Sequence, residues 1–346
     1  MTLSIKDLVY SGDSISVTGG SLLYTEDVAF KPDGLKMYVI GLTNLAAQKI
    51  TTYDLSTAWD ITSATINAET LAPQNSSPKD LTFKSDGVKM YIADGGNTID
   101  EYTLSGAWDV SSATFIQSLD VSVEVGNLRG INVSADGMMI FVGDRSSTYD
   151  IRRYSTSGAW SLTGGTFDTG QAYAPFSEVT GSDAYSYDVF LSSDGFMMYV
   201  LGNSYDVIYE YTLGTAWDLT TVSYGDTSDD YLDVTTQDSD PGGFWMDESH
   251  IYLLGSSNDY VYQYDFPITA SFTGTVSEEG SFVARTVRAY SRITGALVQE
   301  TTSNGGTGEF TFDALEGDGA EHYIVILDDD AGDDYNALVF GRIVGV

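Results

Sequence analysis

Short runs of alternating hydrophobic and polar residues, separated by turn residues, recur along the first three quarters of the chain. One copy consists of residues 81–83, the turn 84–87, and residues 89–93, 100–104 and 113–117. Alternation over so few residues between turn residues is typical of half-buried β-strands. Each copy therefore predicts four short strands.

Two dipeptides mark the copies. The first returns every 50 to 58 residues as Asp33-Gly34, Asp86-Gly87, Asp136-Gly137 and Asp194-Gly195. The second, Ala-Trp, places Trp59, Trp108, Trp160 and Trp217 22 to 26 residues after each Asp. A four-stranded unit repeated at this period predicts a β-propeller, in which each unit buries one face against the next.

A fifth copy covers residues 244–246, 251–253 and 261–264, with Asp247-Glu248 in place of Asp-Gly and no Ala-Trp. It stops after three strands, while residues 14–17 have the pattern of a single extra strand. Pairing the two would remove both exposed strand edges. The sequence thus predicts an all-β chain with a five-bladed propeller over residues 1–267, closed by the N-terminal strand.

The period ends after Pro267. Six short strand-like runs separated by Gly-rich turns follow, at residues 271–276, 286–290, 297–301, 309–312, 322–327 and 337–346. This pattern predicts a small β-sandwich over residues 268–346. We expect it to be an attachment or partner module.

The Trp residues could serve as stacking platforms for sugars. Their appearance once per copy, at one position, instead favours a role in packing.

Asp27, Asp80 and Asp188 stand at equivalent positions just before the first strand of three copies. Side chains there would ring one mouth of a central channel, where three carboxylates could bind a cation or act as glycosidase acid and base. The alternative, which we favour, is that each Asp accepts N–H bonds from the loops of its own copy.

Aromatic residues collect where the repeat is interrupted. An insertion at 168–187 and an acidic stretch at 226–240 carry the recognition candidates Tyr173, Phe176, Tyr185, Tyr187 and Tyr231. Aromatic residues at loop tips are common contacts for glycans and proteins. The alternative is that they fold back to cover the outer strands.

Fifty carboxylates against 15 Lys and Arg give a net charge of −35, which excludes nucleic acid as a favoured partner. No apolar run is long enough for a membrane span or a secretion signal. No cofactor is indicated apart from Ca²⁺, for which Asp328, Asp330 and Asp333 in the run 328–334 are further candidate ligands. A solvated turn is the favoured alternative for that run.

Residues 30–38 (FKPDGLKMY) and 53–60 (YDLSTAWD) resemble propeller modules of bacteriophage tail proteins. The segments VRAY (287–290), GEF (308–310) and LDDDAGDDYNA (327–337) are similar to a small domain that closes marine phage tail proteins. This resemblance implies no catalytic residues.

The resemblance instead implies a virion structural protein without enzymatic activity: a tail-fibre or tail-tip component, made in the host cytoplasm and located in the virion. Its expected partners are other tail proteins, copies of itself and a host-surface glycan or protein bound by the propeller loops. Two alternatives stay open: a carbohydrate-active enzyme that uses channel carboxylates, and a head decoration or fibre protein.

Overall fold

The computed structural model describes residues 5–20, 22–43, 47–146, 151–177, 185–202, 204–224, 231–247, 249–265, 270–278, 280–291, 297–315, 321–327 and 338–344. The chain divides into two compact units, Met1–Phe266 and Pro267–Val346, one residue before the boundary expected from the sequence. Both units are built from β-strands, with a few one-turn 3₁₀ helices in the first. None of the helices in these ranges has the length and apolar character needed to cross a membrane.

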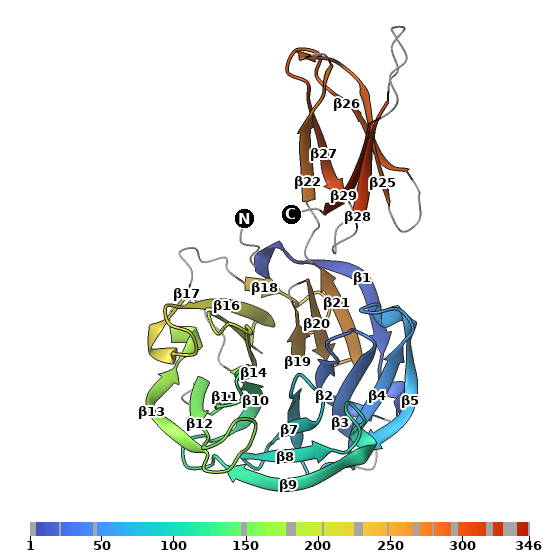
Figure 1. The fold of residues 1–346 in the computed structure, drawn as a ribbon. Helices are drawn as coiled ribbons and strands as arrows, with labels where there is room; N and C mark the ends of the chain where they lie inside the picture. Colours follow the sequence, from blue (N-terminus) through green and yellow to red (C-terminus); the bar gives the residue numbers. More distant parts are fainter. Residues whose placement is uncertain are drawn as a thin grey trace. The chain divides into compact units, whose positions relative to one another are not determined.

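Within its described residues, the first unit contains five antiparallel sheets, arranged side by side around a common centre (Figure 1). Sheet I has β2 (Leu22–Phe30), β3 (Lys36–Thr43), β4 (Gln48–Leu55) and β5 (Ala64–Leu71). Sheet II has β6 (Pro78–Phe83), β7 (Lys89–Asp94), β8 (Thr98–Leu104) and β9 (Ala113–Asp120). Sheet III has β10 (Leu128–Val133), β11 (Met139–Asp144), β12 (Ile151–Ser155) and β13 (Thr166–Tyr173).

The last two sheets depart slightly from this plan. Sheet IV has β14 (Ser186–Leu191), β15 (Met197–Gly202), β16 (Val207–Leu213) and β17 (Val222–Tyr224), with β18 (Tyr231–Asp233) also pairing with β16. Sheet V has β19 (Pro241–Met246), β20 (His250–Gly255), β21 (Tyr260–Asp265) and, as its fourth strand, β1 (Val9–Ser16).

The predicted pairing of the N-terminal strand with the last copy is present. Ile15 of β1 faces Val261 of β21, and Ser16 faces Tyr260, in antiparallel register. The first strand of each sheet contacts the first strand of the next, and β19 also contacts β2. The edge that β21 would otherwise expose is therefore covered by the beginning of the chain.

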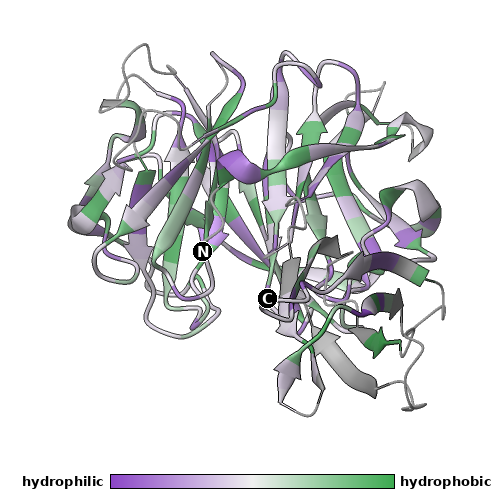
Figure 2. Ribbon diagram, turned by 90° about the horizontal axis from the view of Figure 1, so that it is seen from above, coloured by the Kyte–Doolittle hydropathy of each residue, from purple (hydrophilic) through white to green (hydrophobic). Residues whose placement is uncertain are grey.

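The hydrophobic core of the first unit lies between neighbouring sheets. Five buried clusters each draw their residues mainly from two adjacent sheets, and one of them joins sheets V and I. In that cluster the rings of Phe30 and Tyr252 stack with centroids 4.1 Å apart. Figure 2 shows hydrophobic residues concentrated on the strands. The apolar positions of the repeat are thus the contacts that hold one copy to the next.

The Asp-Gly and Ala-Trp dipeptides meet in one turn. In sheet II, Gly87 has φ +73°, and a Cβ atom built there would lie 2.3 Å from Nε1 of Trp108. The backbone N–H of Trp108 donates to the carbonyl of Gly87 over 3.0 Å. Sheets I, III and IV repeat this arrangement with Trp59, Trp160 and Trp217. The prediction that the Trp residues serve packing is confirmed.

In three of the sheets, the Asp that directly follows the Trp positions the chain for the fourth strand. Asp60, Asp109 and Asp218 cap the 3₁₀ helices η3 (Ile61–Ser63), η4 (Val110–Ser112) and η6 (Leu219–Thr221). Each carboxylate accepts the backbone N–H two residues later, which leads the chain into β5, β9 or β17. The remaining short helices are η1 (Ile5–Asp7), η2 (Thr18–Gly20) and η5 (Pro175–Ser177).

The second unit has its own core. Its strands are β22 (Ala270–Thr275), β23 (Ser277–Glu278), β24 (Ser281–Phe282), β25 (Thr286–Ser291), β26 (Leu297–Thr302), β27 (Glu309–Leu315), β28 (Glu321–Ile326) and β29 (Leu338–Val344). One sheet has the order β26-β25-β28-β29, while β22 pairs with β27 and β23 with β24. Phe310 and Phe312 of β27 share a buried cluster with Val287 of β25 and Ile324 of β28.

Candidate functional site

Three aspartates converge where the first strands of the sheets meet. Asp27 lies on β2, Asp80 on β6 and Asp188 on β14, with exposed fractions of 2%, 4% and 4%. Sheets III and V carry Gly130 and Gly243 at the equivalent positions.

These glycines make room for the carboxyl groups. A Cβ atom on Gly243 would lie 2.3 Å from Oδ1 of Asp27, and one on Gly130 would lie 2.8 Å from Cα of Asp188. Five side chains of ordinary size would therefore not fit here, and three carboxyl groups occupy the space.

Each carboxyl group ties its own sheet to the next one along the chain. Oδ2 of Asp27 accepts the N–H of Leu81 on sheet II over 3.2 Å, and Oδ2 of Asp188 accepts the N–H of Phe244 on sheet V over 2.9 Å. Asp80 accepts the N–H of Ile131 on sheet III. The sequence analysis expected backbone donors from each residue's own copy. Asp188 fits that expectation, since its Oδ1 accepts the N–H of Val189 over 2.7 Å.

The three carboxyl groups influence the pKa values of one another. Burial raises the pKa of Asp80 well above its usual value, the nearby charge of Asp27 adds to this, and Asp80 hydrogen-bonds with both Asp27 and Asp188. Burial and the charge of Asp188 likewise raise the pKa of Asp27. Burial and the charge of Asp80 raise that of Asp188.

A hydrogen bond between two carboxyl groups requires a proton on one of them, because ionised carboxylates only accept. Burial and mutual repulsion raise the pKa values of all three groups, so the cluster loses its protons at a higher pH than an exposed Asp does. Carboxyl groups that share a proton in this way can act as general acid and general base on the same substrate.

The structure does not confirm the cation sites predicted from the sequence. In the parts of the chain that the structure describes, no group of three or more His, Cys, Asp or Glu side chains is arranged to hold a metal ion. Asp328, Asp330 and Asp333 lie outside the described residues. Binding of Ca²⁺ by these residues or by the central aspartates stays a prediction.

Three of the predicted recognition residues, Tyr173, Phe176 and Tyr231, pack against Tyr209 or Tyr211 of β16. Tyr173 ends strand β13 and meets Tyr211 edge-on with centroids 5.6 Å apart, and Phe176 is 6% exposed in the core between sheets III and IV. Tyr231 on β18 is 37% exposed. Much of the expected insertion loop is thus strand or core, because residues 166–173 and 186–191 pair within their sheets. A recognition role for the five aromatic residues stays a prediction.

Tyr185 and Tyr187 belong to a charged cluster that the sequence analysis did not single out. Glu26, Lys79, Arg129 and Tyr187 each stand at an irregularity in the first strand of a sheet, immediately before the Asp or Gly position at the centre. Such β-bulges redirect side chains and are frequent beside active sites. Comparing the residue directly before the Asp or Gly position in each copy of the sequence would have identified these four residues.

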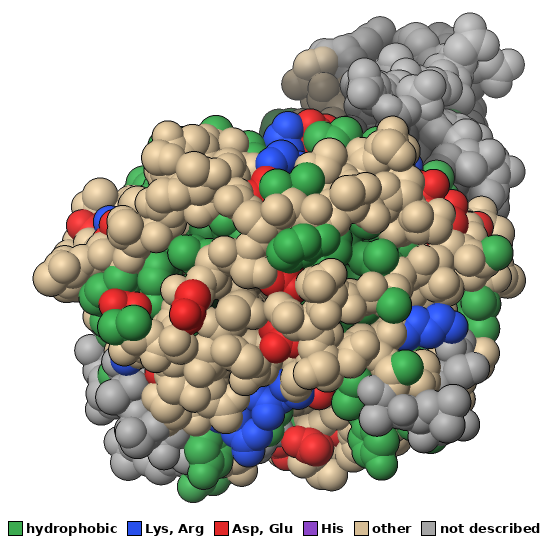
Figure 3. All heavy atoms as spheres, turned by 90° about the horizontal axis from the view of Figure 1, so that it is seen from below, with side chains coloured by type: hydrophobic (Ala, Val, Ile, Leu, Met, Phe, Trp, Pro, Cys, Tyr) green, Lys and Arg blue, Asp and Glu red, His purple; other side chains and the backbone are tan. Residues whose placement is uncertain are grey.

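Contacts within this cluster are short. Oε1 of Glu26 accepts from Nζ of Lys79 over 2.5 Å, and its Oε2 accepts from Nη1 of Arg129 over 3.2 Å. The guanidinium groups of Arg129 and Arg145 lie 4.9 Å and 4.8 Å from the ring centroid of Tyr187. On the face drawn in Figure 3, by contrast, the acidic and basic side chains lie in small separate groups.

The sequence matches no protein-family model and no curated protein. Structural matches are numerous, with 994 solved chains. Two are described as a "putative 6-phosphogluconolactonase", one from Bacteroides uniformis (15% identity, TM-score 0.40) and one from Bacteroides fragilis (17% identity, TM-score 0.41). They cover 61% and 63% of this chain, which spans only 55% and 56% of their length. A functionally unknown protein from Desulfotomaculum acetoxidans matches over 93% of this chain and 86% of its own, at 14% identity and TM-score 0.40.

These findings overturn the identity predicted from the sequence. The interpretation as a non-enzymatic bacteriophage tail or virion protein is corrected here: of the three structures named above, two are described as a putative 6-phosphogluconolactonase and none as a phage protein, and the likeness itself extends to the fold alone. The module residues quoted for the resemblance are those that build the turns and the core between sheets. Such residues specify an architecture, and one architecture serves unrelated functions. The virion location and the expected partners are tested by none of these findings and stay predictions.

Proposed function

We propose that this protein is an enzyme that hydrolyses a carbohydrate-derived substrate, with Asp27, Asp80 and Asp188 as its acid–base group. The observation that carries the proposal is the convergence of three buried carboxyl groups from different sheets, all with raised pKa values. Clustered carboxyl groups with raised pKa values, in a place that excludes water, are characteristic of acid–base catalysis.

The spacing of the carboxyl groups favours one kind of hydrolysis. Two carboxyl groups that flank a glycosidic bond stand about 5 to 9.5 Å apart. Carboxyl groups in hydrogen-bond contact are closer than that and resemble a dyad that shares one proton and activates water against a carbonyl carbon. An ester or lactone of a sugar therefore suits the cluster better than a glycosidic bond.

The roles follow from the contacts. Asp80, bonded to both neighbours, would hold the shared proton and deliver it to the carbonyl oxygen of the substrate. Asp188 receives backbone N–H bonds on both oxygens, which stabilise its ionised form, so it would be the base that takes a proton from water.

The test is a turnover assay of the full chain on a panel of sugar lactones, sugar esters and oligosaccharides. We expect hydrolysis of a lactone or ester, and a loss of about 100-fold or more in kcat for Asp80→Asn and Asp188→Asn. Asp33→Asn, in an exposed turn, is the matched control and should keep full activity.

Unfolding by urea is measured on each variant to separate chemistry from structure. An inactive wild-type protein, or Asn variants that lose stability without losing any turnover, would show that the cluster only joins the sheets.

We also infer that the first unit is a closed five-bladed propeller and the second a small β-sandwich. Closure is supported by the β1–β21 pairing and by the core shared between sheets V and I. The sandwich is supported by the core that β27 shares with β25 and β28 of the four-stranded sheet.

A further inference from the structure

The charged cluster formed by Glu26, Lys79, Arg129, Arg145, Tyr185 and Tyr187 lies next to the central aspartates. Lys79 directly precedes Asp80, and Tyr187 directly precedes Asp188. Arg145 follows β11, and its N–H donates to the carbonyl of Asn127 at the start of β10, which brings it to the same end of the sheets. At this end of the sheets, the acidic side chains lie at the centre, and a layer of largely basic side chains lies beside them.

The basic residues of this layer exceed their carboxylate partners. Lys79 and Arg129 share the single carboxylate of Glu26. Arg145 has cation–π contacts and, among the described residues, no carboxylate at ion-pair distance. Burial raises the pKa of Tyr187, and the charge of Asp240, like that of Glu26, raises it further. Within this layer, three cations stand against the two carboxylates of Glu26 and Asp240, with the three buried aspartates beside them.

Two guanidinium groups are held in place by tyrosine rings. Arg129 and Arg145 both stack on Tyr187, and Arg145 also lies 4.9 Å from the centroid of Tyr185. Stacking fixes the plane of a guanidinium group and leaves the N–H groups at its edge available to an acceptor.

A buried N–H donor of Arg129 also favours a bound anion. Nε of Arg129 is buried and, among the described residues, has no hydrogen-bond acceptor, although the neighbouring Nη1 reaches Glu26. A buried guanidinium N–H without an acceptor costs free energy, and a bound anion would remove that cost.

We propose that Lys79, Arg129 and Arg145 form a subsite for the anionic group of the substrate, a phosphate monoester or a carboxylate on a sugar. This rests on the proposed function for the identity of the sugar, but the binding itself requires no turnover. Arg145 and the Nε edge of Arg129 would contact the anion, while Glu26 keeps Lys79 and Arg129 aligned. The anion would then hold the substrate with its reacting carbon towards Asp80.

The experiment measures binding of glucose 6-phosphate, glucuronate and glucose to the full chain by calorimetry at equal ionic strength. We expect both anionic sugars, or one of them, to bind and glucose to bind at least tenfold more weakly. The two anionic arms distinguish phosphate from carboxylate recognition. Affinity for the anionic sugars should fall as salt is raised.

Arg145→Gln and Arg129→Gln should each weaken the binding of the anionic sugar about tenfold or more, as expected for one lost charge-assisted hydrogen bond. Lys84→Gln removes a cation that pairs with Asp86 in a turn of sheet II and should leave binding unchanged. Arg145 is the safer variant, since it has no ion pair to lose.

Equal affinity for glucose and the anionic sugars, no binding of any of them, or affinity that survives both Arg→Gln variants would overturn the subsite. Failure of the proposed hydrolysis looks different, because the anionic sugars would still bind while no lactone or ester is turned over.

Discussion

At the scale of single residues, glycines decide the geometry of the hairpin turns. Gly87 has φ +73° and supports the indole ring of Trp108, whereas Gly12 has φ +97° and nothing within 4 Å of the position of a Cβ atom. Both positions favour glycine for its backbone freedom. Only at Gly87 would a side chain also collide with the ring.

We expect Gly87→Ala to lower the free energy of unfolding by roughly 2–4 kcal/mol, because backbone strain and overpacking add there. Gly12→Ala should cost only about 1–2 kcal/mol, from backbone strain alone. Urea unfolding of both variants checks this. Equal losses would show that the contact with Trp108 contributes nothing.

The central aspartates predict a pH dependence of stability. Their pKa values are raised in the folded chain, so folded protein binds more protons than unfolded protein above the usual pKa of Asp. Their contribution to stability is therefore fully present below that usual pKa and is lost as the pH rises through the folded pKa values.

Asp80→Asn removes the middle charge and should flatten this dependence. Relative to wild type, the variant should gain stability between pH 4 and pH 8, measured as the difference in urea midpoint at each pH. Asp120→Asn, at an exposed position, should show no such gain. A difference that stays constant with pH would contradict the shared proton.

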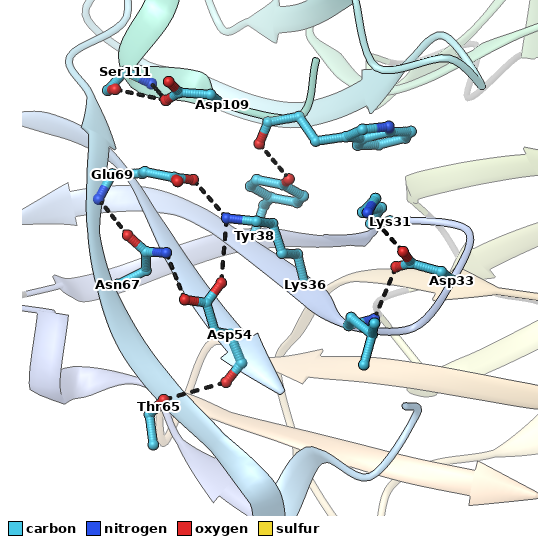
Figure 4. A network of polar contacts seen from close by, with 12 residues as sticks. Lys31, Asp33, Lys36, Tyr38, Asp54, Thr65, Asn67, Glu69, Asp109 and Ser111 are labelled. Atoms are coloured by element: carbon cyan, nitrogen blue, oxygen red, sulfur yellow. Dashed lines mark hydrogen bonds and ion pairs between the residues drawn. The ribbon is translucent and has the colours of Figure 1, made fainter. Parts of the chain in front are cut away.

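At the scale of elements, tyrosines on the second strands join neighbouring sheets. Tyr252 of sheet V donates to the carbonyl of Trp59 on sheet I over 2.7 Å, and Tyr38 of sheet I donates to that of Trp108 on sheet II over 2.7 Å. Figure 4 shows the Tyr38 hydroxyl reaching this carbonyl, with Lys36 nearby bridging Asp54 and Glu69. Tyr91 has the equivalent position on sheet II, but its buried hydroxyl has no partner.

This difference supplies a matched pair of variants. Tyr38→Phe should lower the free energy of unfolding by about 1–2 kcal/mol, because it removes the bond and leaves the carbonyl of Trp108 without that donor. Tyr91→Phe should be neutral or slightly stabilising, since it deletes a buried hydroxyl that bonds to nothing. Thermal unfolding measured side by side distinguishes the two. A larger loss for Tyr91→Phe would be the contradictory result.

At the scale of the whole first unit, the pairing of β1 with β21, the last strand of this unit, completes sheet V. Ser16 and Tyr260 face each other across β1 and β21, and both are exposed. The chain has no cysteine, so a pair of Cys residues placed there can form only one disulfide within the molecule.

We expect the double variant Ser16→Cys, Tyr260→Cys to oxidise readily and to gain roughly 2–5 kcal/mol of stability over its reduced form, because the bridge closes a very long loop. The reduced double variant is the control for the substitutions themselves. Failure to form the bridge, or a bridged form less stable than the reduced one, would contradict the register between β1 and β21.

The activity could not be obtained from the sequence in the same way as the strands. Residues such as Phe30, Gly34 and Trp59 make local or nearest-neighbour contacts, so their spacing reveals what they do. The raised pKa values of Asp27, Asp80 and Asp188 depend on residues that are 53 and 108 positions apart in the sequence. The resemblance of the modules to phage proteins therefore led to a wrong function while describing the right kind of strand.

The sequence by itself determined the strands, the turns, the scaffold role of the Trp residues and the pairing of the N-terminal strand with the last copy, because each follows from local periodicity and from covering an open strand edge. Only the tertiary structure decided that the aspartates bond to the following sheet, that Phe176 lies in the core, and that Lys79, Arg129 and Arg145 gather beside the centre. The reason is physical: burial and charge–charge contact depend on how successive sheets are placed about their common centre, and no single repeat contains that information.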